Sequence, residues 1–385
     1  MLEEARLRTQ QFQSTMEEQG IDLVLLTDES SIAYFAGFWG YLGVEFGRPT
    51  FLVLKRGDEP AVITPLMESE MVNNMTWIDR VLPWEDEGSN RWEHVLARAI
   101  GDSPGTMHVE KPVLPGLVRD VLDVNYSSVT LADISPMLAA QRTIKSPVEI
   151  EVMKQAGRIG AVMMEAAQNN LREGVKEYEV ALAILDAGTR AAAGFLTGKG
   201  WEAYVSPVIH NLQIMQSGRD TAMVHRRAAV KPLARRDPVY FCFCNLLEFK
   251  HYRLGFDRLF FIGEVTDEAV RIQETAIDAQ RAALSEIRAG VKASEVAAAA
   301  NAVYRERGVA PGYRTGRSIG MAYLESPELK EGDNTELRSG MTFAVDGGVT
   351  VTGETGGRIG DSIVVTETGF EFITEYPREV TIVQG

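Results

Sequence analysis

Helix-like and strand-like patterns of apolar residues alternate over the first part of the chain. The segment 2–19 repeats its apolar residues at helical spacing, and DLVLLTD (22–28) is a short apolar run that ends in turn residues. Two further strands flank the turn-forming Gly57-Asp58 pair. These patterns predict a small α/β domain over residues 1–143. Its expected helices are 2–19, 66–76 and 91–100, and its expected strands are 22–28, 49–56, 60–65 and 106–111.

A clear helix start marks the beginning of a second domain, which is expected over residues 144–385. Ser146 suits the N-cap, Pro147 the first helical position, and Glu149 can close a capping box. We expect a long helix from there to link the two domains. Beyond it come helical patterns at 267–289 and 294–308 and strand-rich segments at 237–249, 258–264, 340–351 and 360–374. Helices and strands in clusters favour an α+β domain with an antiparallel sheet.

Composition narrows the range of partners. The 385 residues suit two domains, and 54 acidic against 39 basic residues give a net charge of −15. That charge repels phosphate backbones and anionic lipids, so neither nucleic acid nor a membrane is expected as a partner. The first residues lack the apolar core of a secretory signal, and no apolar run approaches the length of a membrane span. We therefore expect a cytoplasmic protein.

Cys242 and Cys244 are the only cysteines of the chain. Residues two apart in an extended strand point to the same face, but their geometry seldom suits a disulfide. Two cysteines in so long a chain fit a reducing compartment, and no disulfide is expected. We expect Cys244 to line a pocket as a small buried side chain.

Four spaced segments of the second domain carry a resemblance to a known family. In this order, SGRDTAMVH (217–225), 237–263, 315–327 and 339–369 resemble the creatinase/aminopeptidase P/methionine aminopeptidase family, peptidase M24. YFAGF (34–38) and IKSPVEIEVMKQA (144–156) fit the same family, so the resemblance spans nearly the whole chain. It implies an α+β pita-bread catalytic domain at the carboxyl end, preceded by a smaller α/β domain of the creatinase type.

The resemblance also implies that the metal ligands of the family are missing. In its metal-dependent members, two Asp, one His and two Glu side chains bind two divalent cations, which activate a water molecule. The matching positions here are Cys244, Gly255, Arg317, Asp346 and Gly360. Glycine offers no side-chain ligand, and arginine is a permanent cation that repels a metal. We therefore expect no metal and no other cofactor, which argues against a two-metal aminopeptidase.

The creatinase branch of the family hydrolyses its substrate without a metal, and its site matches more positions of this chain. By this resemblance His225 is the general acid and base, while Asp257 and Asp346 hold the cationic group of the substrate. The run Phe46-Gly47-Arg48 matches the F-G-R segment that a partner subunit lends to bind the substrate carboxylate. The resemblance thus implies a homodimer whose site is completed by the partner's N-terminal domain.

These side chains suit the attack of water on a C–N carbon. A histidine can take a proton from water and return it to the leaving nitrogen. Two carboxylates favour an amidinium or guanidinium, and an arginine binds a carboxylate bidentately. Arg317 adds a second cation near the pocket, and the hydroxyl of Tyr252 is a further candidate for substrate contact. The expected substrate is a small zwitterion. Its C–N bond is either cleaved as in the creatinase reaction, or lies in a ring that is opened as in the ectoine hydrolase reaction. In a covalent variant, Asp257 attacks first.

Other interpretations of the same residues stay open. A metal-dependent Xaa-Pro peptidase or lyase is one, with shifted ligands at His225, His251, Asp257 and Asp346. A binding protein on an inactive enzyme scaffold is another. Asp257 and Arg258 can form a plain ion pair at a strand end, and Asp346 can serve a turn. For His251 we expect a solvent-exposed side chain. Trp39 and Tyr41 can either cover the pocket or pack in the core.

Overall fold

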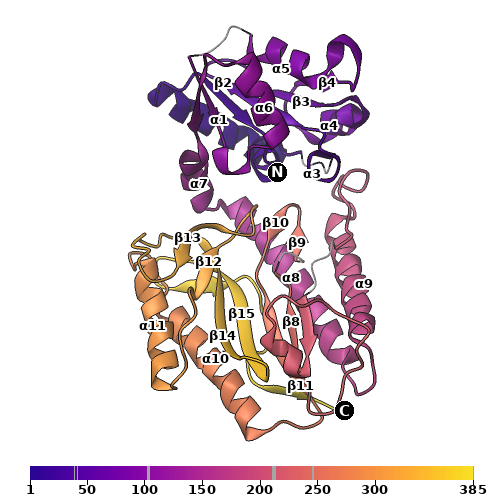
Figure 1. Ribbon diagram of the computed structural model, residues 1–385, viewed down its shortest axis with the longest axis vertical. Helices are drawn as coiled ribbons and strands as arrows, with labels where there is room; N and C mark the ends of the chain where they lie inside the picture. Colours follow the sequence, from indigo (N-terminus) through magenta and orange to yellow (C-terminus); the bar gives the residue numbers. More distant parts are fainter. Residues whose placement is uncertain (39, 41, 102–104, 210–213, 245–246, 385) are drawn as a thin grey trace. The chain divides into compact units, whose positions relative to one another are not determined.

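The computed structural model describes residues 1–38, 40, 42–101, 105–209, 214–244 and 247–384. Trp39 and Tyr41 lie outside the described residues. The chain forms two compact units, Met1–Arg142 and Thr143–Gly385 (Figure 1). Within the described part of the chain, no helix is both long enough and apolar enough to cross a membrane.

The first unit is a mixed six-stranded sheet with helices packed on it, in the strand order β4-β3-β2-β1-β5-β6. Apolar side chains of the strands, such as Leu25, Phe51 and Ile63, pack against Trp92 and Val95 of a covering helix. This confirms the α/β expectation for the first domain. The strands are β1 Leu23–Leu26, β2 Phe51–Lys55, β3 Ala61–Pro65, β4 Arg80–Trp84, β5 Thr106–Val109 and β6 Thr130–Asp133. The helices are α1 Leu2–Glu18, α2 Glu29–Ala36, α3 Leu42–Phe46, α4 Ser69–Met75, α5 Trp92–Ile100, α6 Gly116–Asn125 and α7 Ser135–Thr143.

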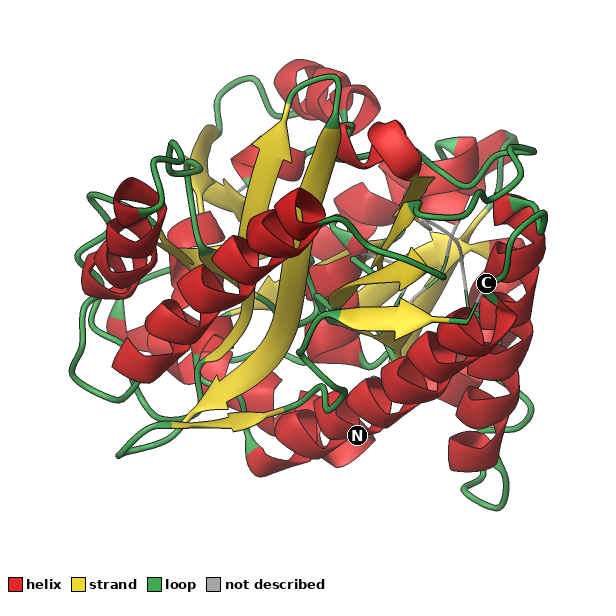
Figure 2. Cartoon of the chain, turned by 90° about the horizontal axis from the view of Figure 1, so that it is seen from below, coloured by secondary structure: helices red, strands yellow, loops and turns green. Residues whose placement is uncertain are grey.

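The second unit contains a nine-stranded sheet whose main path runs β13-β12-β14-β15-β11-β8-β7. The strands along this path pair antiparallel, as expected for the pita-bread domain. Figure 2 shows long helices lying against strands of the chain. The strands are β7 Ile214–Ser217, β8 Pro238–Cys242, β9 Glu248–Phe249, β10 Tyr252–Arg253, β11 Asp257–Ile262, β12 Gly316–Ser318, β13 Glu325–Leu329, β14 Thr342–Val351, β15 Thr355–Val365, β16 Phe370–Phe372 and β17 Thr381–Val383. The helices are α8 Pro147–Asn170, α9 Glu177–Leu196, α10 Asp267–Glu286 and α11 Ala293–Glu306.

The expected capping box starts the long helix α8. Ser146 accepts a hydrogen bond from the backbone N–H of Glu149, and the Glu149 carboxylate accepts one from the N–H of Ser146. Pro147 occupies the first helical position, where its missing N–H costs nothing.

Alternation along β14 separates the face that packs on α10 and α11 from the opposite face of the large sheet. Phe343, Val345 and Val349 belong to the core that α10 and α11 cover. Gly347 lies on the same face, where a Cβ atom would stand 2.0 Å from the backbone oxygen of Ala276 in α10. Helix α10 therefore packs directly on the backbone of β14. The residues between these positions, Ala344, Asp346, Gly348 and Thr350, point to the opposite face.

Candidate active site

Register brings the two candidate acids together on the face of the sheet away from α10. Gly360 of β15 stands opposite both Asp257 of β11 and Asp346 of β14, and these strands are neighbours in Figure 1. A Cβ atom on Gly360 would lie 2.7 Å from Asp346 Oδ1 and 3.0 Å from Asp257 Cγ. The two carboxyl groups therefore meet over a residue that has no side chain.

Asp257 is buried and holds its proton more strongly than an ordinary aspartate. Its side chain is 6% exposed, and the Tyr240 hydroxyl donates a 2.8 Å hydrogen bond to Oδ2. Burial, and then the charge of Asp346, raise the pKa of Asp257 to about 7, against smaller lowering contributions from Tyr240, Arg317 and Arg358. A carboxyl group with this pKa can give or take a proton near neutral pH.

Arg317 is fixed beside Asp346. Its Nη1 donates to Asp346 Oδ2 at 2.7 Å, its Nη2 donates to the Tyr323 hydroxyl, and its Cζ lies 4.4 Å from the Tyr323 ring centre. A Cβ atom on Gly255 would stand 3.0 Å from Nη2, so the guanidinium fills the space beside that glycine. Asp346 Oδ1 is buried and has no hydrogen-bond partner in the described part of the chain. Arg317 thus neutralises one acid and leaves one oxygen of it for another donor.

His225 lies in an exposed turn after a short 3-10 helix, Gly218–Ala222. Its neighbour Arg226 is anchored by Glu177, which is fully buried at the start of α9. Arg226 Nη1 donates to Glu177 Oε2 at 2.7 Å and Nη2 to Asp220 Oδ2 at 3.0 Å. Among the described residues, the structure gives no hydrogen bond between His225 and either candidate acid. These hydrogen bonds of Arg226 fix the turn that carries His225, and the His225 side chain is exposed to solvent.

The residues expected to bind the substrate carboxylate lie in the first unit. Phe46 ends α3 and is 65% exposed. Arg48 Nη2 lies 2.7 Å from Asp86 Oδ2, and Nη1 contacts Met67 Sδ at 3.7 Å. Arg48 is therefore ion-paired within its own unit, and this pair must open if Arg48 is to bind a substrate.

Two residues of the 248–253 ribbon lie differently from what we expected. His251 is not solvent-exposed, because a turn with φ of 67° brings its ring inward to 4% exposure, with Nδ1 3.6 Å from Glu248 Oε1. That prediction was wrong. Tyr252 is 1% exposed, and its hydroxyl donates to Glu149 Oε1 at 3.0 Å. This hydroxyl therefore supports the start of α8.

Cys242 and Cys244 form a disulfide, against our expectation. Strand β8 ends at Cys242, and beyond it the chain departs from the extended form, so the Cα atoms are only 5.3 Å apart. That separation lies within the range of disulfides. Cys244 does border the acids, since its Sγ lies 3.4 Å from Asp257 Oδ1 and 3.4 Å from Arg317 Nη2.

The alternative structural roles of the two acids do not hold. Asp346 lies in the middle of β14 and serves no turn. The Asp257 carboxylate forms no ion pair with Arg258 in the described structure, because Arg258 Nη2 donates to Asp361 Oδ1 at 2.8 Å and Nη1 donates to the backbone oxygen of Asp257. Arg258 therefore does not neutralise the Asp257 carboxyl group, which accepts from Tyr240 instead.

The side chains around the acids do not fit a pair of hard divalent cations. Among the described residues, one group of three His, Cys, Asp or Glu side chains has its ligand atoms within 4.8 Å of one another, namely Cys242, Cys244 and Asp257. Both sulfurs of this group are bound in the disulfide. His225, His251 and Asp346, expected as shifted ligands, are not part of it. The guanidinium of Arg317 instead occupies the position beside Asp346.

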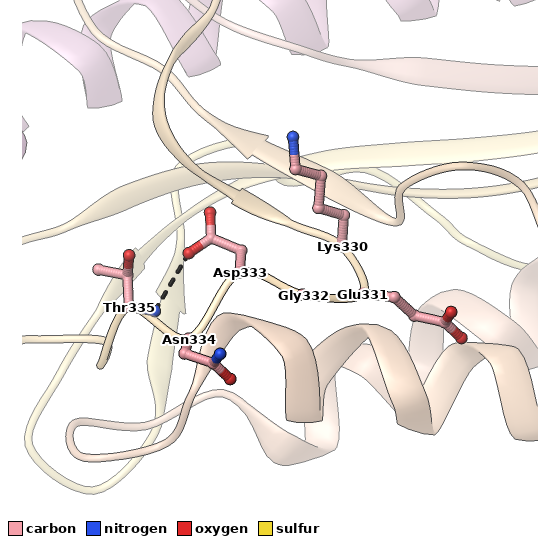
Figure 3. A pocket seen from close by; sticks show the side chains of 6 residues that line it. All are labelled: Lys330, Glu331, Gly332, Asp333, Asn334 and Thr335. Atoms are coloured by element: carbon pink, nitrogen blue, oxygen red, sulfur yellow. Dashed lines mark hydrogen bonds between the residues drawn. The ribbon is translucent and has the colours of Figure 1, made fainter.

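Three residues of the site were not predicted: Tyr240, Tyr323 and Arg358. Tyr240 lies two residues before Cys242 in the same strand, so strand alternation gave a signal for it. Tyr323 lies six residues after Arg317, beyond a bend, and no local sequence pattern predicts that its hydroxyl contacts the Arg317 guanidinium. The hollow in Figure 3 is a separate feature, formed by the single turn 330–335, in which Asp333 Oδ1 accepts from the N–H of Thr335 at 3.1 Å. It contains none of the candidate residues.

Comparison with known proteins identifies the family of the chain. Residues 151–367 match the model of metallopeptidase family M24, and residues 8–144 match that of the creatinase/prolidase N-terminal domain. The chain belongs to metallopeptidase family M24. It is 30% identical over 391 residues to agropine synthesis cyclase of Rhizobium rhizogenes, covering 96% of this chain and 95% of that protein. It is 26% identical over 391 residues to creatinase of Bacillus sp. (strain B-0618), covering 97% and 91%.

Solved structures support the same fold. The X-Pro aminopeptidase from Thermotoga maritima superposes with a TM-score of 0.83 at 23% identity, covering 97% of this chain and 99% of that one. At this identity the likeness concerns the fold alone. The family assignment supports a hydrolase or lyase, and the sequence relatives span both hydrolases and a cyclase.

Proposed function

We propose that this chain is a metal-independent hydrolase that cleaves a C–N bond of a small carboxylate-bearing amidine, guanidine or amide. The observation that carries the proposal is the pair of carboxyl groups over Gly360, with the Arg317 guanidinium beside them. Such a pair suits a planar cationic group that donates several hydrogen bonds. Asp346 Oδ1, buried and without a partner among the described residues, offers one acceptor. Asp257 Oδ1 offers a second, because the Cys244 sulfur beside it is bound in a disulfide and has no proton to donate.

In the proposed reaction His225 moves the protons and the two acids hold the substrate. His225 takes a proton from a water molecule whose oxygen attacks the amidine carbon, giving a tetrahedral intermediate. The C–N bond then breaks as the same proton passes to the leaving nitrogen. Hydrogen bonds from the substrate to Asp257 and Asp346 strengthen as the carbon becomes tetrahedral. The hydroxyl group of the intermediate loses its remaining proton as the C=O bond forms, and this proton ends on the released amine. The other product is a urea from a guanidine, an amide from an amidine, or a carboxylic acid from an amide.

Turnover of a substrate panel tests this proposal. The panel contains creatine, ectoine, other carboxylated amidines, ureas and N-acyl amino acids, and each product is identified by mass spectrometry. For a true substrate, His225→Ala should lower kcat by about 10²–10⁴. Arg190→Gln, at an exposed helix position, is the matched control and should leave turnover unchanged. Binding across the panel without any turnover would support a non-catalytic binding protein instead.

A second candidate activity is the cyclisation of a similar substrate. The likeness to a protein named agropine synthesis cyclase over 96% of the chain favours it. The same acid and base would then activate a nucleophile of the substrate in place of water. The two activities differ in their products, because hydrolysis adds the mass of one water and a dehydrating cyclisation removes it.

We also propose that the active form is a homodimer in which Phe46 and Arg48 of one subunit complete the site of the other. A mixture of two inactive variants, Arg48→Gln and His225→Ala, tests this arrangement. Mixed dimers would contain one intact site, so reassembly of an equal mixture should restore about a quarter of the wild-type activity. If both variants are inactive and the mixture stays inactive after subunit exchange is shown, the shared site is refuted.

A further inference from the structure

Arg358 lies on the same face of the sheet as the two acids. It precedes Gly360 by two residues in β15 and stands opposite Gly348 of β14. A Cβ atom on Gly348 would lie 2.7 Å from Arg358 Nη1, so the guanidinium rests directly on that glycine. Its Nη2 donates to Thr350 Oγ1 at 2.6 Å. The guanidinium therefore lies over β14 at Gly348, two residues along the strand from Asp346.

The charge of Arg358 lowers the pKa of Asp257, but Arg358 forms no ion pair with an acid in the described part of the chain. Arg317 is paired with Asp346, and Arg258 with Asp361, at distances of 2.7 and 2.8 Å. Arg358 has no carboxylate within ion-pair distance among the described residues, and its Nε is buried without a hydrogen-bond partner there. A half-buried cation with an unused donor is costly unless something anionic binds it.

We propose that Arg358 binds the carboxylate of the substrate, while Asp257 and Asp346 bind its cationic end. This inference rests on the proposed function and adds a second residue for the anionic group, besides Arg48 of the partner subunit. Arginine can hold a carboxylate through two parallel N–H···O bonds from one edge of its guanidinium. On the edge formed by Nε and Nη2, Nε–H has no acceptor among the described residues, and Thr350 accepts from only one of the two N–H groups of Nη2.

Strand geometry then sets the length of the substrate. Asp346 and Gly348 are two residues apart in β14, a distance of about 7 Å along an extended strand. The matching substrate therefore carries its cationic and anionic groups at separate positions, joined by a short spacer. A guanidino or amidino acid meets that requirement better than a plain α-amino acid, whose two charges are adjacent.

Binding of matched small molecules tests the role of Arg358. Guanidinoacetate carries both charges, and methylguanidine carries only the cation. In titration calorimetry, Arg358→Gln should weaken guanidinoacetate binding about 10- to 100-fold and leave methylguanidine unchanged. Arg358→Lys should recover part of the loss, and Arg190→Gln should change neither affinity. Equal losses for both molecules, or none for guanidinoacetate, would overturn the inference.

A second measurement separates this inference from the proposed function. In ¹⁵N-labelled protein, sodium acetate should shift the Nε–H signal that is absent in Arg358→Lys. If acetate leaves this signal unmoved, Arg358 is not the anion site, whatever the enzyme turns over. If acetate shifts it but no panel compound is turned over with dependence on His225, the anion site stands and the proposed hydrolase fails.

Discussion

Replacing Asp257 with asparagine should stabilise the protein at alkaline pH, although it removes a candidate catalytic group. Burial and the nearby Asp346 raise the pKa of Asp257 from 3.8 to about 7. The unfolded chain releases this proton near pH 3.8, whereas the folded protein keeps it up to about pH 7. The stability that the proton provides is complete below the lower value and is lost as the pH rises through the upper one. Asparagine has almost the same shape and does not titrate.

The expected magnitude follows from the width of that window. Each pH unit within it changes the free energy of unfolding by about 1.4 kcal/mol, so the whole window corresponds to about 4 kcal/mol. Between pH 5 and pH 8 the wild type should therefore lose about 2–3 kcal/mol that Asp257→Asn keeps. The asparagine oxygen can still accept the hydrogen bond from Tyr240, so little of this gain should be offset.

Urea unfolding of both proteins at several pH values measures the difference. The transition to follow is the one that includes the second unit, because the chain has two units that can unfold separately. Asp346→Asn is the matched control, with the opposite expected sign. It leaves the buried Arg317 without its partner and should cost about 2–3 kcal/mol, less than for a fully buried pair because the Asp346 side chain is 30% exposed. A stability difference between wild type and Asp257→Asn that does not change with pH would refute the reasoning.

Three further predictions concern the candidate site, the turn that carries His225, and the ligand. Gly360→Ala places a methyl group between the two carboxyl groups and must push them apart, so it should lower kcat at least about tenfold in steady-state assays. Gly194→Ala is the control: its methyl group on α9 meets no neighbouring atom, and it should add about 0.5–1 kcal/mol of stability. Glu177→Gln removes the buried partner of Arg226 and should cost about 2–4 kcal/mol in thermal unfolding; unchanged kcat would show that this network does not position His225. A true ligand at 100 times its Kd should stabilise the protein by about 2.7 kcal/mol, and a thermal-shift screen that finds no such zwitterion would count against the substrate class.

Local signals predicted the frame of the molecule well. The capping box of Ser146 and Glu149 fixed the start of α8, because every group involved lies within four residues. Helix α2 was missed, because all of its residues except Glu29 are buried and no amphipathic period remains to be seen. Its signals are local caps, with Asp28 accepting from the N–H of Ser31 and Gly37 ending the helix at a φ of 78°.

The candidate site was predictable only as far as the family resemblance named its residues. Asp257 and Asp346 are far apart in sequence, and only the pairing of three strands makes them neighbours over Gly360. The partners of Arg317 could not be predicted for the same reason. No local sequence pattern predicts that Arg358 belongs to the site, because the space for its guanidinium is left by Gly348 on the neighbouring strand. Such relations depend on register, which pairs positions distant in the chain.

Activity after metal removal tests the central claim most directly. The purified protein is stripped with a chelator, its content of divalent metals is measured by elemental analysis, and turnover of a substrate from the panel is compared before and after. The account predicts full activity with far less than one metal ion per chain, because Arg317 stands beside Asp346 where a cation would be repelled. Activity that disappears on stripping and returns with Mn²⁺, Zn²⁺ or Fe²⁺ would contradict it.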